Sequence, residues 1–343
     1  MSLSGSRKSY ALVGDIGGTR SLLELFVEHD GALRSAHEGS YRSGAFAGFD
    51  ALLEEFLAQA GVVPGEIDAA CFSVAGPVEG GVCALTNLDW QIDAAALSAR
   101  FKIPEVRLLN DFAAVGHGIA SLGEHDVVTI QRAMAQPRGT RLVVGAGTGL
   151  GVCMLNWQGE GYAVHPSEAG HTDFAPLDAT QDALLASLRK PFGRVSYERI
   201  VSGPGLLRIF SFLQNEGGGM PSRQLLEAMQ KQDEAAAISE FAVSKRDPLA
   251  VHALDLFIAV YGAFAGNMAL STLSRGGVYI AGGIARQIAA KLGDGSFVRA
   301  FTGKGRFEDF LRRYPVHIVT DPKIGLKGAL STAQSFCCST CSA

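Results

Sequence analysis

Two glycine-rich turns in the 343-residue sequence have residue types suited to binding phosphate. Because glycine has no Cβ, phosphate oxygens can approach consecutive main-chain N–H groups closely, and a threonine hydroxyl adds a further donor. The first turn contains Gly14, Asp15, Ile16, Gly17, Gly18 and Thr19, and the second contains Gly147, Thr148 and Gly149. Mg²⁺ prefers oxygen ligands, so we expect Asp15 to be an outer-shell ligand of a hydrated Mg²⁺ ion.

Neither turn matches the two commonest nucleotide-binding motifs. In a G-x-G-x-x-G frame that starts at Gly145, the sixth position is Leu150, and no G-x-x-x-x-G-K-[S/T] segment occurs. Each turn alone could be a plain tight hairpin. A third glycine pair, Gly282 and Gly283, opens an expected helix, and a helix N-terminus favours a bound phosphate. The three sites together favour nucleotide binding.

Asn110 and Asp111 follow an expected buried strand and precede an expected helix. An aspartate in this place can simply cap the helix. It can also act as a general base, because a sugar hydroxyl that attacks phosphorus must lose its proton to an acceptor within reach. Asp111 is therefore a candidate general base.

A second polar group contains His165, Glu168 and His171, which resemble a metal site in composition. The intervening proline and glycine argue against a helix, so the spacing does not bring the three side chains together as helical spacing would. The alternative is a site for a polyol, in which Glu168 accepts hydrogen bonds from hydroxyl groups and His171 adds another. Glu198 either supplies a second carboxylate or is an exposed residue near a helix.

Charge and composition exclude several classes of protein. The formal net charge is −4 and no long run of Lys or Arg occurs, so the sequence lacks the footprint of a nucleic-acid binder. Hydrophobic residues make up 47% of the chain, which excludes intrinsic disorder. The polar start, MSLSGSRKSY, has no apolar core of a secretory signal.

The six cysteines fall into two groups. Cys71, Cys83 and Cys153 lie in apolar, strand-like runs, which is typical of reduced core thiols. The other three occur in the C-terminal FCCSTCSA segment, where Cys338 and Cys341 form a C-x-x-C pair without a second pair to complete a zinc site. This usage of cysteine indicates a reducing cytoplasm.

The order of expected elements indicates an α/β protein of two related domains. A buried strand, a glycine turn and a second strand occur at 10–27 and recur at 141–157, 130 positions later. Further strands are expected at 67–74, 106–109, 277–281 and 316–320. Helices are expected at 46–60, from 112 to about 122, and at 181–189, 205–214, 223–231, 234–245, 249–273, from 284 and near 326–335.

The stretch at 256–274 has no charged residue and would just cross a bilayer. Polar residues dilute it and a strand-like segment follows at once, so we expect a buried helix and no membrane partner. Gly262 and Gly266 would then let a neighbouring element approach the helix backbone closely.

Eight motifs together resemble the bacterial glucokinase family, in order from about residue 12 to residue 328. They are GDIGGT at 14–19, AGPVEGG at 75–81, TNLDW at 86–90, LLNDF at 108–112, GAGTGLG at 145–151, EAGHTDFAP at 168–176, ERIVSGPG at 198–205 and GGVYIAGGI at 276–284. Each motif alone is weak, whereas EAGHTDFAP with LLNDF and the two glycine turns is specific.

The resemblance implies an actin-like ATPase (ribonuclease H-like) fold with two α/β domains and a cleft between them. One domain would comprise 1–121 with a C-terminal helix at about 321–343, and the other 122–320. The implied activity is ATP-dependent phosphorylation of D-glucose to glucose 6-phosphate with Mg²⁺, by a cytoplasmic homodimer.

The alternatives are a kinase for another hexose (mannose, fructose or an N-acetyl-amino sugar) or a non-catalytic sugar-binding regulator. Only about ten residues precede the first strand, which is too few for the helix-turn-helix that such regulators usually carry.

The resemblance also implies roles for single residues. Asp111 would be the general base, and the glucose ligands would be Asn110, Glu168, His171 and Glu198. Residues 14–19 and 147–149 would form the two phosphate loops, with Gly282 and Gly283 on the adenosine side. The chain departs from the family at Arg20, where Asn is more common, and in its cysteine-rich tail. The cysteines that mark the zinc-binding ROK subgroup are absent after His171, which disfavours that subgroup.

Overall fold

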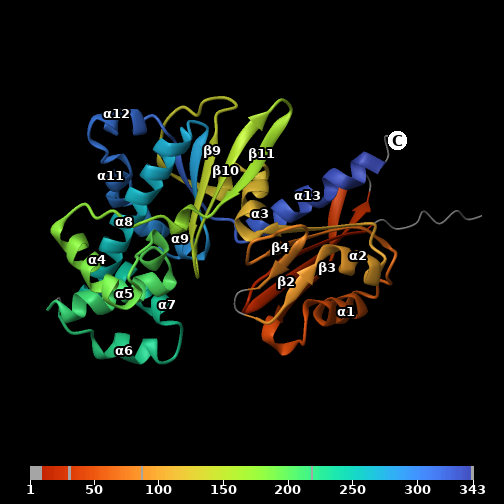
Figure 1. The fold of residues 1–343 in the computed structure, drawn as a ribbon, viewed down its shortest axis with the longest axis horizontal. Coiled ribbons are helices and arrows are strands. Elements are labelled where there is room, and N and C mark those ends of the chain that lie inside the picture. Colours follow the sequence, from red (N-terminus) through yellow and green to blue (C-terminus); the bar gives the residue numbers. More distant parts are fainter. Residues whose placement is uncertain (1–9, 30–31, 86–87, 218, 341–343) are drawn as a thin grey trace, which may run out of the picture. The chain divides into compact units, whose positions relative to one another are not determined.

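The computed structural model describes residues 10–29, 32–85, 88–217 and 219–340, with the side chains of 124 and 336–340 left out of the description. The chain divides into two compact units, residues 1–122 with 323–343 and residues 123–322. Each unit contains a mixed β-sheet with helices, which confirms the α/β class (Figure 1). Residues 1–9, Cys341 and part of the TNLDW motif lie outside the described residues.

The first unit has a sheet in the order β3-β2-β1-β4-β7. Its strands are β1 (Tyr10–Ile16), β2 (Arg20–His29), β3 (Ala32–Arg42), β4 (Ile67–Val74) and β7 (Glu105–Asn110). The first three form an antiparallel meander, and β4 and β7 run parallel to β1. A separate two-stranded sheet pairs β5 (Val82–Ala84) with β6 (Gln91–Asp93).

Helices cover both faces of this first sheet. Leu12 and Ile16 point to a core that includes α1 (Phe49–Ala60) and α2 (Ala94–Phe101). Val13 points to the opposite face, against α13 (Ile324–Thr340), which packs beside α3 (Asp111–Gly118). Figure 1 shows the blue α13 alongside the red and orange strands, although it comes from the other end of the chain. The side chains of β1 alternate between the two faces because successive residues of a strand point to opposite sides of the sheet.

The second unit repeats this strand order and extends it, as β11-β10-β9-β12-β13-β8. Its strands are β8 (Val127–Gln131), β9 (Arg141–Ala146), β10 (Leu150–Gln158), β11 (Gly161–Ser167), β12 (Gly277–Ala281) and β13 (Val316–Val319). Strands β9, β10 and β11 form an antiparallel meander, β12 and β13 run parallel to β9, and β8 is an antiparallel edge strand. The predicted repeat of strand, glycine turn and strand is therefore present as two matching hairpins.

Most helices belong to the second unit. They are α4 (Ala179–Phe192), α5 (Gly203–Asn215), α6 (Arg223–Met229), α7 (Glu234–Val243), α8 (Pro248–Thr272), α9 (Gly283–Gln287), α10 (Ala289–Leu292), α11 (Ser296–Thr302) and α12 (Glu308–Leu311). Several short 3₁₀ turns connect them, including η4 (Ala169–His171) and η5 (Tyr197–Arg199).

Helix α8 contains the uncharged stretch and is the central core helix of its unit. Within the described part of the chain it is long and apolar enough to cross a membrane, but 78% of its apolar window is buried inside the structure. A Cβ on Gly262 would lie 2.4 Å from the Phe297 carbonyl oxygen, and one on Gly266 would lie 2.3 Å from that of Phe301. The two glycines thus let α11 approach closely, as predicted.

Some elements differ from the sequence-based expectations. The longest unexpected strand, β3, alternates between exposed and half-exposed residues, so it lacks the apolar period that identifies a strand. The helix expected from residue 46 begins at Phe49, after the N-cap Gly48. The three thiols predicted to be buried and reduced, Cys71, Cys83 and Cys153, are buried and are not in disulfides.

Candidate functional site

The glycine turn of the first unit joins β1 to β2. The Gly17 N–H donates to the Arg20 carbonyl oxygen at 3.1 Å, and a Cβ on Gly17 would lie 2.9 Å from that oxygen. The turn is also held by a side chain, because the Ser43 hydroxyl donates to the Gly17 carbonyl at 2.7 Å and contacts the Ser21 hydroxyl at 2.9 Å. Thr19 is exposed, whereas Gly14 and Ile16 are buried in the strand. The supporting serines were not predicted, because they come from separate segments.

The carboxylates of the first unit lie where parallel strands end. In the sheet register, Ile16 of β1 is opposite Val74 of β4, which is opposite Asn110 of β7. Asp15 therefore lies at the same edge as Asn110 and Asp111. The Ser73 hydroxyl donates to Asp15 Oδ1 at 2.9 Å. Burial raises the pKa of Asp15 above its usual value, and the bond from Ser73 partly offsets this.

Asn110, rather than Asp111, is the N-cap of α3. Its Oδ1 accepts hydrogen bonds from the N–H groups of Phe112 and Ala113 at 3.0 and 3.2 Å, and its Nδ2 donates to the Gly76 carbonyl at 3.2 Å. Asp111 occupies the first turn of the helix, where the dipole favours a negative charge. Burial and, to a smaller extent, the charge of Asp111 raise the pKa of Cys83. Asp111 Oδ1 also accepts from the Phe112 N–H at 2.9 Å. Asn110 is thus the N-cap, and Asp111 lies half-buried beside it at the strand end.

The glycine turn of the second unit joins β9 to β10. The Gly147 N–H donates to the Gly149 carbonyl at 2.8 Å, and the Gly147 carbonyl accepts from the Gly203 N–H at 2.8 Å. At the other end, the Leu150 N–H donates to Glu198 Oε2 at 3.0 Å. The turn is therefore held at both ends by the segment that carries Glu198.

Three of the predicted polar side chains converge beside this turn. His171 Nε2 lies 3.8 Å from Glu168 Oε2, and His171 Nδ1 lies 3.8 Å from Glu198 Oε1. The side chains of Glu168, His171 and Glu198 are 74%, 55% and 30% exposed, so a ligand can reach all three. His165 lies on β11 opposite Met154 and is not part of this set. Over the described residues, no three His, Cys, Asp or Glu side chains are arranged to hold a metal ion.

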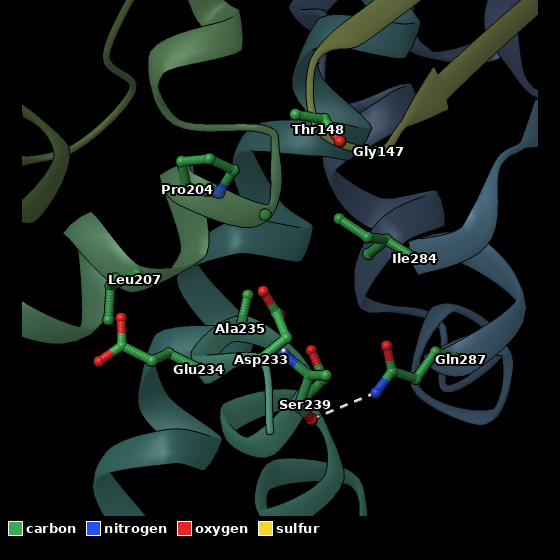
Figure 2. Close-up of a pocket in the computed structure, with 12 residues that line it drawn as sticks. Gly147, Thr148, Pro204, Leu207, Asp233, Glu234, Ala235, Ser239, Ile284 and Gln287 are labelled. Atoms are coloured by element: carbon green, nitrogen blue, oxygen red, sulfur yellow. Dashed lines mark hydrogen bonds between the residues drawn. The ribbon is translucent and has the colours of Figure 1, made fainter. Parts of the chain in front are cut away.

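A cavity of about 420 Å³ opens beside the second turn (Figure 2). It is lined by Gly147, Thr148, Gly203, Pro204, Leu207, Asp233, Glu234, Ala235, Ala236, Ser239, Ile284 and Gln287. None of these lining residues is a lysine or an arginine. Figure 2 shows Thr148 and Gly147 at one end of the cavity and Ser239 and Gln287 at the other. The shape and lining suit a ligand with an apolar ring body and a few hydrogen-bonding groups.

The predicted pair Gly282 and Gly283 lies just before the cavity wall. Gly282 has a φ of +94°, and a Cβ on it would lie 2.7 Å from the Ala146 carbonyl oxygen. Only glycine fits this position, and it lets the start of α9 lie close to the end of β9, next to the second turn. The next residue after the pair, Ile284, lines the cavity.

Sequence reasoning missed the far wall of the cavity. Asp233 caps α7, with Oδ1 accepting from the Ala236 N–H at 2.9 Å. Gln287 Nε2 donates to the Ala236 carbonyl at 3.2 Å, the bond dashed in Figure 2. An Asp before an apolar helical run is a cap signal, but nothing local indicates that the cap faces a cavity.

Each unit thus gathers its own part of the predicted set. The first unit brings together Asp15, Asn110 and Asp111 at one sheet edge. The second brings Glu168, His171 and Glu198 to the glycine turn, of which Gly147 and Thr148 line the cavity.

Comparisons with known proteins find a match over nearly the whole chain. A family model described as Glucokinase matches residues 12–336. The glucokinase of Synechocystis sp. is 41% identical over 347 aligned residues, which cover 94% of this chain and 98% of that protein. The crystal structure of a glucokinase from an Antarctic psychrotroph is similar with a TM-score of 0.79 at 28% identity, covering 95% of this chain and 99% of that one. A glucokinase from Balamuthia mandrillaris in complex with glucose has a TM-score of 0.80 at 22% identity, covering 97% and 95%, and shares the fold.

Proposed function

The chain belongs to the glucokinase family, and on that premise we propose that it transfers the γ-phosphoryl group of ATP to the 6-hydroxyl group of D-glucose. The observation that carries this proposal is the convergence of Glu168, His171 and Glu198 beside a glycine turn. Two carboxylates and an imidazole suit the hydroxyl groups of a sugar, and the turn suits the phosphates of the donor.

In this proposal the second unit binds both substrates. Glu168 and Glu198 accept hydrogen bonds from sugar hydroxyls, and His171 between them donates or accepts another. Asn110 of the first unit is the remaining proposed sugar ligand. Such bonds fix the orientation of the sugar, and positioning supplies a large part of catalysis in phosphoryl transfer.

The cavity is the proposed site of the adenosine group. Its apolar walls, Pro204, Leu207 and Ile284, suit an aromatic base, and Ser239 and Gln287 offer hydrogen bonds to it. Because the lining has no cationic side chain, the phosphates would be bound by the glycine turns at 147–149 and 17–18. The proposed donors are the N–H groups of Gly18, Thr148 and Gly149 and the hydroxyls of Thr148 and Thr19. The N–H groups of Gly17 and Gly147 donate to nearby carbonyl oxygens, so these two glycines contribute close approach instead. The glycines at 282 and 283 would support this site from the side of α9.

Asp111 is the proposed general base, which would accept the proton of the attacking hydroxyl group. Asp15 has a carboxylate at the same strand ends and suits an outer-shell contact to Mg²⁺, because carboxylate oxygens are hard ligands. Mg²⁺, when bound to the nucleotide, neutralises charge on the phosphates. A cation near Asp15 would also favour its ionised form against the effect of burial.

The wider organisation is part of the proposal. We infer that the two units are the two domains of an actin-like ATPase (ribonuclease H-like) fold with a substrate cleft, and that the enzyme is a cytoplasmic homodimer. The strand order β3-β2-β1-β4-β7, repeated as β11-β10-β9-β12-β13, supports the duplicated-domain fold.

The test is sugar-dependent ADP release from ATP, measured with glucose, mannose, fructose and N-acetylglucosamine at equal concentrations. We expect the highest kcat/KM with glucose and only slow release without sugar. A higher kcat/KM for another hexose would make the protein a kinase of that sugar, and sugar-independent release alone would contradict the proposal.

A further inference from the structure

Leu150, the residue at the end of the second glycine turn, contacts both segments of the polar set. Its N–H donates to Glu198 Oε2 at 3.0 Å. Its carbonyl oxygen lies against Gly170, because a Cβ built there would be only 2.0 Å from that oxygen. The turn that faces the cavity and the segments that carry the proposed sugar ligands therefore meet at one residue.

Glu198 directs its two carboxylate oxygens to different partners. Oε2 accepts the Leu150 N–H and lies 2.7 Å from where a Cβ of Gly149 would be. Oε1 lies 3.8 Å from His171 Nδ1, on the side of the polar set. One carboxylate group thus borders the turn and the sugar side at once.

The backbone after Glu198 continues the connection. The Ser202 hydroxyl donates to the Glu198 carbonyl at 2.7 Å, and the next residue, Gly203, donates its N–H to the Gly147 carbonyl at 2.8 Å. Gly203 also lines the cavity. The segment from Glu198 to Gly203 therefore holds the first and the last residue of the turn.

We propose that Glu198 is a positioning residue that couples the sugar set to the nucleotide turn. This inference rests on the proposed function and goes beyond it. A sugar hydroxyl that donates to Glu198 fixes the orientation of its carboxylate, and the same carboxylate then holds the Leu150 N–H and the turn in one conformation. A turn ordered in this way binds phosphate without a further loss of conformational entropy. By reciprocity, nucleotide binding strengthens sugar binding by the same factor.

Glu168 provides a matched control within the same set. It is the other carboxylate 3.8 Å from His171, and it is more exposed than Glu198. Among the hydrogen bonds of the described residues, none joins its side chain to the turn. Glu168→Gln and Glu198→Gln therefore remove the same charge from the same set, and only the second changes the contact to Leu150.

The experiment measures the Kd of the non-hydrolysable analogue AMPPNP with Mg²⁺ by calorimetry, without glucose and at saturating glucose. We expect glucose to tighten nucleotide binding in the wild type by a factor of about 5–150, a typical range for coupled sites. In Glu168→Gln the glucose Kd should rise, yet the coupling factor should stay within about twofold once glucose is saturating. In Glu198→Gln the factor should fall at least threefold, because a neutral acceptor bonds an N–H less strongly than a carboxylate does.

Hydrogen exchange gives a second measurement that does not depend on glucose affinity. Without sugar, Glu198→Gln should speed exchange in the peptide that contains residues 147–151, and Glu168→Gln should not. Equal losses of coupling in the two variants, with equal exchange, would overturn the proposal. A coupling factor of one in a wild type that still shows glucose-dependent ADP release would also overturn it, and would leave the proposed function intact.

Discussion

The two units contain the same hairpin, but they surround it with different side chains. In the first unit the penultimate residue of β1 is Asp15, which accepts a hydrogen bond from Ser73 of the neighbouring strand. In the second unit the equivalent neighbours on β9 and β12 are Gly145 and Ala281, which have no polar side chain. There, the turn is held by Glu198, which comes from a segment outside the sheet.

This difference separates what a repeated fold supplies from what single residues add. Both hairpins offer backbone N–H groups in a glycine turn, which suits any phosphate. The first unit adds carboxylates at its strand ends, for which we propose roles in proton transfer and in binding a cation. The second adds exposed hydrogen-bonding side chains and a cavity. We therefore expect substitution of Asp111 in the first unit to lower kcat, and substitution of the sugar ligands in the second unit to raise KM or Kd.

The largest effect should come from Asp111→Asn. Loss of the proposed general base should lower kcat by about 10²–10⁴-fold, while the glucose Kd changes little. Steady-state kinetics at saturating ATP and glucose, with calorimetry of glucose binding, would measure the two quantities. Near-normal kcat in a folded variant would remove the catalytic distinction between the units.

A smaller change, and of another kind, is expected for Glu168→Gln. A hydrogen bond to a charged group contributes about 1.5–3 kcal/mol, so the glucose KM should rise by about 10- to 100-fold. The kcat at saturating glucose should stay within a few-fold of the wild type. Initial rates over a glucose series would show this, and a selective loss of kcat would contradict a binding role.

The packing of helices can be tested in the first unit with two glycines of α13. A Cβ on Gly328 would lie 1.8 Å from the Ala114 carbonyl oxygen, whereas a Cβ on Gly325 meets nothing within 4 Å. Gly328→Ala should therefore lower the free energy of unfolding by about 1–3 kcal/mol. Gly325→Ala should be neutral or stabilise the protein by up to about 1 kcal/mol through helix propensity. Urea unfolding would measure both, and equal stabilities would rule out the close contact of α13 with α3.

The smallest effect should be a change in the pH dependence of stability in Asp15→Asn. Burial raises the pKa of Asp15 in the folded state, so folding favours the protonated carboxyl group. The stability that this group contributes to the fold is fully present below the ordinary pKa of 3.8, and it is lost as the pH rises through the folded pKa. At neutral pH the neutral Asn should therefore stabilise the fold, and the gain should shrink as the pH falls toward 4. Urea unfolding at several pH values would measure the gain, and a gain independent of pH would exclude this cause.

Much of the fold could be predicted because its signals are local. Strand β4 was predicted with its observed bounds, and α8 to within a residue at each end, because both are continuous apolar runs. Strand β3 could not be found, since an edge strand exposed along its length has no hydrophobic period. The N-cap of α3 was assigned to Asp111 as one alternative, and the side-chain geometry gives it to Asn110.

The site was predictable in composition but not in its connections. Residue types and the glycine clusters indicated Glu168, His171 and the second turn, and the family resemblance indicated a sugar-binding role for Glu198. Nothing local indicates that Glu198 bonds the Leu150 N–H, because the two residues are 48 positions apart and meet only in the folded unit. The far wall of the cavity could not be predicted for the same reason, since Asp233 and Gln287 belong to different helical segments that meet only in the folded unit.

The return of α13 to the first sheet has a consequence for synthesis on the ribosome. Val13, Ala69 and Cys71 form a face that is covered by Leu326, Ala329 and Ala333, which are translated after the whole of the other unit. The intervening unit, residues 123–322, is continuous in sequence and can fold as it emerges. At about 5–20 residues per second, its synthesis takes roughly 10–40 s, and for that time the first sheet exposes one apolar face. The nascent chain therefore exposes this apolar face of the first unit until the residues of α13 have been translated.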